Sequence, residues 1–225
     1  MIAMILAAGR GERLRPLTDD CPKPLMQVGE RCLIEYHLLK LAQQGVACVV
    51  INHAWLGDKI EAALGCGSRY GLKIEYSAEP EGGLETAGGI IQALPKLGDR
   101  PFWVINADVF SALDFAQLPR DLAEGSLAHL MLVPTPSFKP QGDFGLTPAG
   151  RVTAQGEWTF SGFSLLSPAL FDGLAPGRRA LAPLLREAMA QGAVTGEVYQ
   201  GYWSDIGTLS RLEAARNWLK NGAAI

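Results

Sequence analysis

A glycine-rich turn with charged side chains, between Leu6 and Leu25, contains the residue types that bind phosphate groups. The sequence reads LAAGRGERLRPLT and, shortly after, CPKPL. Gly9 and Gly11 permit a tight turn, in which backbone N–H groups approach a ligand closely. Arg13 can form paired hydrogen bonds with phosphate oxygens, and Lys23, held between two prolines, adds a positive charge. This stretch predicts binding of a phosphorylated ligand.

Two aspartates are candidates for holding a cation. Asp108 stands just after an apolar segment, FWVI, that predicts a strand ending in Asn106-Ala107-Asp108. An acid at the end of a strand emerges at the rim of a sheet, although Asp108 could instead cap its own turn. Asp205, in WSDIGT, could hold the same cation or simply lead into the next helix. Mg²⁺ suits such a site, because it prefers a few carboxylates together with waters and substrate phosphates.

The glycine turn matches neither of the two best-known phosphate motifs. Leu14 stands where G-x-G-x-x-G needs its third glycine, and no G-x-x-x-x-G-K-[ST] occurs. The pattern L-A-A-G-x-G-x-R-L-x-P-L-T with a later K-P-L instead resembles the signature of the sugar-1-phosphate nucleotidylyltransferases. That resemblance implies the reaction of an NTP with a sugar 1-phosphate to give an NDP-sugar and pyrophosphate, with Mg²⁺ as the cofactor. A non-catalytic nucleotide-sensing domain is the alternative from another class, and the presence of both aspartates and Lys23 argues against it.

The resemblance implies a role for residues along most of the chain. Arg13, Lys23 and Asp108 are the expected catalytic residues, and Asp108 and Asp205 are the expected metal ligands. The segment EPEGGLETAGGI resembles the family's nucleobase loop, although it could be only a flexible turn before a helix. The expected nucleotide-binding residues are Leu6, Ala8, Gly9, Gly11, Glu12, Arg13, Lys23, Gly83, Glu85 and Thr86.

The sugar side is less completely matched. Asn106, Asp143, Gly145 and Glu157 are the expected sugar-binding residues, and Asp143 could equally cap the turn in which it lies. Gly142-Asp143-Phe144-Gly145 resembles the family's glycine-aromatic-glycine loop. Many relatives have a lysine after the glutamate, to hold the sugar phosphate, but Trp158 follows Glu157 here. Arg151, Lys139 or the metal ion could take over that task.

Three further segments resemble a particular group within the family. NHAWLGD, LETAGGI and TFSGFSLL, together with the short length, favour members that transfer a uridylyl group from UTP to N-acetylmuramate α-1-phosphate in cell-wall recycling. The alternative is guanylyl or thymidylyl transfer to mannose or glucose 1-phosphate. The chain shows no long carboxy-terminal extension of the kind that adds a second domain in some relatives, so residues 1–225 are expected to form a single nucleotidyltransferase domain.

Hydrophobic segments along the chain alternate between strand-like and helix-like patterns. This order predicts a doubly wound, mostly parallel, Rossmann-like α/β sheet with helices on both faces and a small β-rich sugar-binding flap. Strands are expected at residues 1–6, 46–51, 72–77, 102–105, 127–133, 159–166 and 194–199, with a loop at 134–150. Helices are expected at residues 33–44, 59–64, 86–94 and 180–191 and after Thr208, with Asp58, Thr86 and Thr208 as N-caps.

Composition indicates an ordinary globular protein with small-molecule partners. The 225 residues are 48% hydrophobic and 19% charged, with a net charge of −3, so nucleic acid is a poor candidate partner. No segment approaches the length of a membrane span, and no obligate protein partner is indicated. Four widely spaced cysteines favour neither a metal site nor a disulfide framework, and we expect a cytoplasmic protein with reduced thiols.

Overall fold

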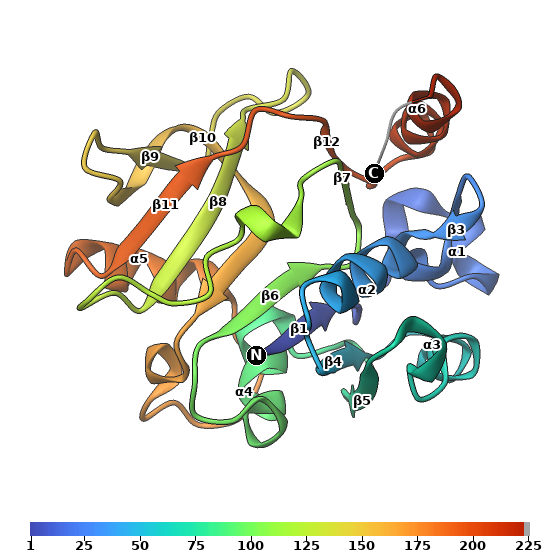
Figure 1. The fold of residues 1–225 in the computed structure, drawn as a ribbon, viewed down its shortest axis with the longest axis horizontal. Helices are drawn as coiled ribbons and strands as arrows, with labels where there is room; N and C mark the ends of the chain where they lie inside the picture. The colour runs from blue at the N-terminus through green and yellow to red at the C-terminus, as the bar shows by residue number, and fades with distance from the viewer. Residues whose placement is uncertain (223–225) are drawn as a thin grey trace.

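Residues 1–222, the part of the chain that the computed structural model describes, are organised around one eight-stranded sheet (Figure 1). Seven strands lie in the order β11-β8-β10-β6-β1-β4-β5, and β9 pairs with β10. β1 pairs in parallel with β4 and β6, β4 with β5, and β8 with β11, whereas β10 is antiparallel to its neighbours. The strands span Ile2–Leu6 (β1), Cys48–His53 (β4), Lys73–Ala78 (β5), Phe102–Asn106 (β6), Ala128–Pro134 (β8), Phe144–Leu146 (β9), Val152–Leu166 (β10) and Val194–Val198 (β11).

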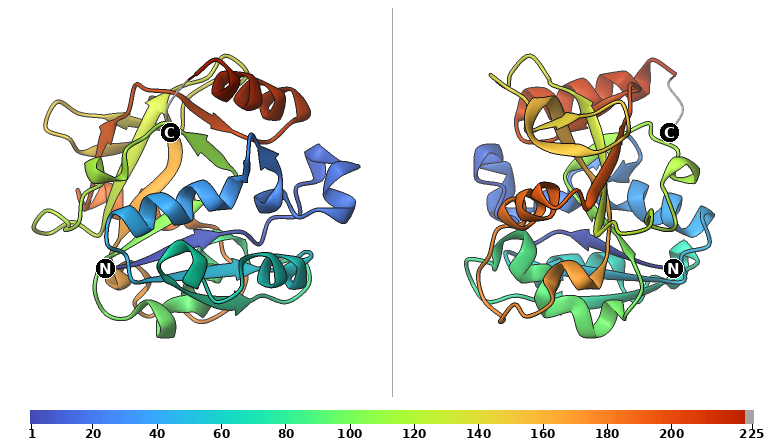
Figure 2. Two further views of the ribbon diagram at one scale, coloured as in Figure 1. Left: turned by 45° about the vertical axis from the view of Figure 1, so that its right-hand side comes forward. Right: turned by 90° about the vertical axis from the view of Figure 1, so that its left-hand side faces the viewer.

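Helices cover both faces of this sheet, as Figure 2 shows from two sides. On one face, α2 (Leu33–Gln43) and α3 (Gly57–Leu64) pack on alternate strand residues such as Ile5 and Ile51. On the other face, α4 (Glu85–Leu97) and α5 (Leu181–Ala190) pack on the intervening residues, such as Met4 and Val50. The period of two along each strand therefore fills two separate cores. The expected doubly wound, mostly parallel sheet is confirmed.

A smaller apolar cluster holds the last part of the chain against the first loop. It contains Leu14, Val28, Phe110, Ile206 and Leu212. These residues join the short pair β7 (Val109–Ser111) and β12 (Trp203–Asp205) to α6 (Leu209–Lys220) and to the hairpin of β2 (Gln27–Val28) and β3 (Arg31–Cys32). The short α1 (Leu17–Asp20) lies nearby on the first loop. Asp205 is in this way brought close to Asp108, although almost half of the chain separates them.

Residues 134–160, which we call the flap, contain more strand than the sequence predicts. β10 begins at Val152 and not near Thr159, and β9 lies inside the expected loop. The two strands approach so closely that a Cβ on Gly145 would lie 2.3 Å from Thr153 Oγ1 and 2.6 Å from the Gln155 carbonyl oxygen. Gly145 thus permits a close pairing of β9 with β10, which the pattern of apolar residues in the sequence does not predict.

The helix starts correct two of the three predicted N-caps. α4 begins at Glu85 with Leu84 as N-cap, and α3 begins at Gly57 with Leu56 in a left-handed conformation as N-cap. Thr86 and Asp58 therefore lie inside their first turns. Thr208 is confirmed, because its side chain accepts a hydrogen bond from the Arg211 N–H. None of the helices among residues 1–222 is long and apolar enough to cross a membrane, and all four cysteines are free thiols.

Candidate functional site

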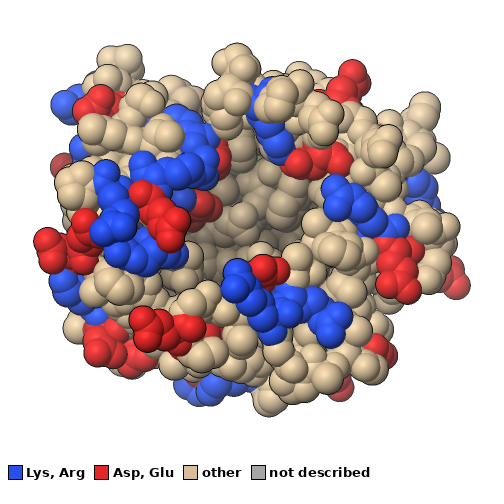
Figure 3. Space-filling model, turned by 180° about the vertical axis from the view of Figure 1, so that it is seen from behind, with Lys and Arg blue, Asp and Glu red and all other residues tan. Residues whose placement is uncertain are grey.

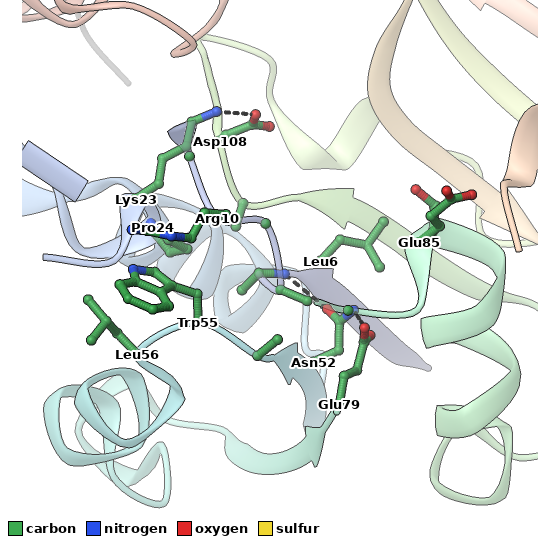
Figure 4. Close-up of a pocket in the computed structure, with 18 of the residues that line it drawn as sticks. Leu6, Arg10, Lys23, Pro24, Asn52, Trp55, Leu56, Glu79, Glu85 and Asp108 are labelled. Carbon is green, nitrogen blue, oxygen red and sulfur yellow. Dashed lines mark hydrogen bonds and ion pairs between the residues drawn. The ribbon is translucent and has the colours of Figure 1, made fainter. Parts of the chain in front are cut away.

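A cleft of about 840 Å³ opens at the carboxyl ends of β1, β4, β5 and β6 (Figure 4). Eleven residues predicted from the sequence line it, namely Leu6, Ala8, Gly9, Gly11, Glu12, Lys23, Gly83, Glu85, Thr86, Asn106 and Asp108. They come from the glycine turn, the loop before α4 and the end of β6. These segments meet because parallel strands end at one edge of the sheet.

The glycine turn is shaped by Gly11 and left open by Gly9. Gly11 has a φ of 70°, and a Cβ there would lie 2.9 Å from Thr18 Cγ2. The Thr18 hydroxyl donates a hydrogen bond to the Gly11 carbonyl oxygen (2.9 Å), which ties the turn to α1. A Cβ on Gly9, by contrast, would meet no atom within 4 Å. Gly9 therefore serves no packing need of the protein and leaves space in which a ligand can reach the backbone.

Lys23 and the two aspartates form a charged group at one side of the cleft. Lys23 is buried, and its Nζ lies 2.5 Å from Asp108 Oδ2. Asp205 pairs with Arg211, and its neighbour Ile206 donates a backbone hydrogen bond to the Asp108 carbonyl oxygen (2.8 Å). Burial raises the pKa of Asp205, the charge of Arg211 opposes that shift, and the nearby charge of Asp108 adds to it. Two carboxylates, each paired with a cation on one oxygen, thus stand near each other.

A buried hydrogen-bond chain, which the sequence analysis missed, connects the two nucleotide-side loops. The Ala7 N–H donates to Asn52 Oδ1 (2.9 Å), and Asn52 Nδ2 donates to Glu79 Oε1 (2.6 Å). Glu79 Oε2 then accepts from the Leu84 N–H (2.7 Å). Asn52 lies near the end of β4 and Glu79 follows β5, so the strand-end rule that selected Asp108 would also have selected them.

A second missed feature is a stacked pair at the edge of the cleft. The guanidinium carbon of Arg10 lies 3.5 Å from the centroid of the Trp55 ring, and both residues line the cleft. Arg10 also donates to the Thr18 carbonyl oxygen (3.0 Å) and to Asp19 (3.1 Å). The sequence analysis singled out Arg13 in this turn, but spacing alone does not tell which arginine turns inwards.

Five of the predicted site residues lie outside the lining of the cleft: Arg13, Asp143, Gly145, Glu157 and Asp205. Arg13 is exposed, with its guanidinium close to Gly207 on the Asp205 side. Gly145, as described above, is placed by the pairing of β9 with β10. Asp205, beside Asp108, is the one of the five that belongs to the charged group of the site.

Within the flap, the candidate polar groups bind one another. Asp143 Oδ2 accepts from Lys139 (2.5 Å) and from the Phe160 N–H (3.0 Å). Glu157 is exposed, and its backbone carbonyl oxygen accepts from the Thr135 hydroxyl (2.6 Å). Arg151 donates to the Gly192 carbonyl oxygen (2.7 Å) and to Ser126, away from the cleft-lining residues. These contacts hold Arg151 toward Ser126 and Gly192, and its role at the sugar phosphate, one of the options left open by the sequence, stays a prediction.

Charges of both signs surround a hollow in the molecular surface. Figure 3 shows this hollow with an uncharged floor and with Lys, Arg, Asp and Glu side chains on its rim. Such an arrangement suits an anionic ligand whose uncharged parts lie deep and whose charged groups meet fixed cations.

The fold and the site define an α/β protein with a ligand cleft at the carboxyl ends of its parallel strands and with two aspartates, Asp108 and Asp205, at one side of that cleft. Residues 2–163 match the family model of the nucleotidyl transferases, and the chain belongs to that family. The protein is accordingly a nucleotidyltransferase, as the sequence motifs predicted.

Two curated relatives match along nearly their whole length. The chain is 52% identical to the N-acetylmuramate alpha-1-phosphate uridylyltransferase of Neisseria meningitidis serogroup B, with 96% of this chain and 97% of the relative covered. It is 34% identical to the enzyme of the same name from Caulobacter vibrioides, with coverages of 92% and 91%. A Mycobacterium tuberculosis mannose-1-phosphate guanylyltransferase is 33% identical, but only 61% of its length is covered.

Solved structures support the fold. A crystal structure of a Bacillus anthracis protein in complex with a sucrose has a TM-score of 0.83 at 20% identity, covering 100% of this chain and 97% of that one. HddC from Yersinia pseudotuberculosis, complexed with GMP-PN, has a TM-score of 0.76 at 21% identity, with coverages of 97% and 99%. At such identities the likeness concerns the fold alone.

Proposed function

We propose that the protein transfers a uridylyl group from UTP to N-acetylmuramate α-1-phosphate, producing UDP-N-acetylmuramate and pyrophosphate. The observation that carries this proposal is the 52% identity, over nearly the full length of both chains, to a relative named for that activity. The reaction would serve cell-wall recycling in the cytoplasm, with residues 1–225 acting as one domain. A continuous sheet, packed on both faces, supports the single domain.

The reaction needs alignment and charge neutralisation more than proton transfer. An oxygen of the sugar phosphate attacks the α-phosphorus of UTP, and the bond from that phosphorus to the β-phosphate oxygen breaks. The attacking phosphate is already ionised, so no general base is required. Lys23, whose ammonium group lies beside Asp108 at the cleft, is the proposed catalytic cation for the phosphates, and Arg13 adds charge from the Asp205 side.

We assign the two ends of the cleft to different parts of the nucleotide. Gly83, Glu85 and Thr86 belong to the loop that meets the base, where a glycine allows a planar ring to approach the backbone. Leu6, Ala8, Gly9, Gly11 and Glu12 surround the ribose and the phosphates. The hydrogen-bond chain through Asn52 and Glu79 supports this assignment, because it joins the two loops at a fixed separation.

Asp108 and Asp205 are the proposed ligands of Mg²⁺. One oxygen of each carboxylate is bound by a cation, Lys23 or Arg211, and the second oxygen has no hydrogen bond from any of residues 1–222. The same part of the chain contains no group of three or more His, Cys, Asp or Glu suited to a metal. Two carboxylates with one free oxygen each fit a hard cation that takes the rest of its coordination shell from water and substrate phosphates. When bound, Mg²⁺ would supply positive charge to the reacting phosphates.

Of the four expected sugar-binding residues, Asn106 is the one that lines the cleft. We propose that its amide binds a sugar hydroxyl. Asp143, Gly145 and Glu157 would contribute as parts of the flap that covers the sugar, with Asp143 holding the flap together through Lys139 and the Phe160 N–H.

A sugar nucleotidyltransferase acting on mannose or glucose 1-phosphate is the alternative. Two identities support this alternative: 33% to a mannose-1-phosphate guanylyltransferase and 29% to a Streptomyces griseus glucose-1-phosphate thymidylyltransferase.

A grid of substrates distinguishes these functions. Pyrophosphate release is measured with four NTPs against the 1-phosphates of N-acetylmuramate, N-acetylglucosamine, glucose and mannose, at equal concentrations and with Mg²⁺. The proposal expects the highest kcat/KM for UTP with N-acetylmuramate 1-phosphate. A clear preference for GTP with mannose 1-phosphate would replace it by the alternative.

A further inference from the structure

The cleft has few cations for a ligand that carries several negative charges. Its lining includes five acidic residues but only two basic ones, and the basic residues are Arg10 and Lys23. Lys23 is already paired with Asp108 at 2.5 Å. Arg10 is therefore the other positive charge that the lining offers to a triphosphate.

Arg10 is held in a fixed orientation by three contacts. Its guanidinium stacks 3.5 Å above the ring of Trp55, and it donates to the Thr18 carbonyl oxygen (3.0 Å) and to Asp19 Oδ1 (3.1 Å). An arginine has five N–H donors, so these two hydrogen bonds leave three, none of which has a partner among residues 1–222. The side chain is 29% exposed, which keeps the remaining donors accessible from the cleft.

The neighbours of Arg10 do not need it for their own hydrogen bonds. Asp19 Oδ1 also accepts from Arg15 Nε (2.9 Å), and the Trp55 indole N–H donates to the Thr18 carbonyl oxygen (2.9 Å). A role in completing the local fold therefore does not explain why this arginine faces the cleft. Stacking on an aromatic ring does explain how a long side chain is ordered before a ligand arrives.

Figure 4 places Arg10 and Trp55 on the same side of the cleft as Lys23, while Asn52, Glu79 and Glu85 lie on the other side. The loop proposed for the base is on that second side, so the far end of a nucleotide would reach Arg10. We infer that Arg10, preorganised by stacking on Trp55, binds the β- and γ-phosphates of the NTP and the pyrophosphate that leaves. This inference rests on the proposed function for the nucleotide, but not on the identity of the sugar.

Binding measurements without a sugar test this role. UTP and UMP are titrated calorimetrically, with Mg²⁺, into the wild-type protein and the Arg10→Ala, Arg10→Lys and Arg15→Ala variants. Arg10→Ala should weaken UTP binding by about tenfold or more but change UMP binding less than about twofold, because UMP lacks the terminal phosphates. Arg10→Lys should lie in between. Arg15→Ala is the matched control, because Arg15 is also an arginine that donates to Asp19 Oδ1. This variant should bind both nucleotides as the wild type does.

Inorganic pyrophosphate gives a second measurement in turnover. Arg10→Ala should raise its inhibition constant about as much as it weakens UTP binding, and Trp55→Ala should shift both constants in the same direction by less. Equal weakening of UTP and UMP in Arg10→Ala, or an equal loss in Arg15→Ala, would overturn the inference. If the wild type binds another NTP and not UTP, the proposed uridylyl transfer fails, and the same comparison with that NTP and its monophosphate still decides the role of Arg10.

Discussion

The cleft and the flap each contain a lysine paired with an aspartate at 2.5 Å, yet the two pairs have different surroundings. Asp108 lies just after the end of β6, and Lys23, whose side chain is only 11% exposed, reaches it from the short 3-10 helix Lys23–Leu25. Lys139 and Asp143 lie four residues apart in a flap, and both are about one-third exposed. We therefore expect the first pair, whose members come from distant segments and meet at the cleft, to position charge for a ligand. We expect the second pair, which lies within one loop, mainly to stabilise that loop.

The largest expected effect comes from the two aspartates of the cleft side. Asp108→Ala and Asp205→Ala should each lower kcat roughly 10³-fold, because the proposed Mg²⁺ loses a ligand. This corresponds to an increase of about 4 kcal/mol in the activation free energy. Activity should also disappear in EDTA and return with added Mg²⁺. Steady-state kinetics over a range of Mg²⁺ concentrations, with thermal unfolding as a check on folding, measures this. Full turnover in EDTA would contradict the metal assignment.

The two lysine pairs give a direct comparison. Lys23→Ala should cost on the order of 2–4 kcal/mol of transition-state stabilisation, as for removal of one preorganised electrostatic group. Lys139→Ala removes a pair of the same length from the flap and should cost less than about 1 kcal/mol, because partly exposed pairs are weak. Values of kcat/KM for both variants decide the matter. Equal losses would mean that the flap lysine also meets a substrate.

A pH titration tests the packing of α2 against β10, the strand that runs from the flap into the main sheet. His37 on α2 is buried against Phe115 and against Phe163 of β10, and burial, followed by the charge of Lys40, lowers its pKa to about 4. Between pH 6.5 and about 4 the unfolded chain binds a proton that the folded protein does not, so stability falls as the pH falls. The loss should be about 3 kcal/mol at most.

Urea unfolding across this pH range, followed by probes in both regions, measures that loss. His37→Gln should flatten the pH dependence whatever its effect at neutral pH. Probes that report separate transitions would show that cleft and flap unfold independently.

The last expected effect concerns the hydrogen-bond chain of the cleft. A Cβ on Gly89 would lie 2.3 Å from Glu79 Oε1 and 2.7 Å from Asn52 Nδ2. Gly89→Ala should therefore displace the chain, destabilise the protein by roughly 1–3 kcal/mol and raise the KM for UTP more than it lowers kcat. Asn52→Ala should act through the same contacts, so the double variant should be less than additive. Additive effects would show that Gly89 and Asn52 act separately.

The sequence predicted the parts of the fold that follow from local patterns. Apolar segments located seven of the eight strands of the sheet, all except β9, and the glycine turn located the cleft. The strand pair β7 and β12 was missed, because three-residue strands carry no detectable period and depend on packing around Phe110 and Ile206. The caps at Thr86 and Asp58 were wrong, because α3 and α4 begin earlier, after Leu56 and Leu84. Leu84 is held by contacts that are distant in sequence: its N–H donates to Glu79, and its carbonyl oxygen accepts from the Arg179 N–H.

The site shows the same division between local and long-range information. Lys23 and Asp108 were predicted individually, but their contact depends on how β6 ends beside the first loop. Arg10 was overlooked in favour of Arg13, since the side chain that faces the cleft is selected by Trp55, a residue from a different strand end. Sequence spacing indicates which residues are available, and the meeting of distant strand ends decides which of them act.

The pairing of β12 with β7 has a consequence for how the enzyme matures on the ribosome. Chains emerge from the amino terminus, and the residues that line the nucleotide cleft all lie within the first 108 positions. Asp205 arrives only with the last strand, and it takes its place by pairing alongside Val109. On the proposed assignment, a nascent chain could hold a nucleotide before it contains the metal-ligand pair, so turnover would begin only after Asp205 has emerged and paired with β7.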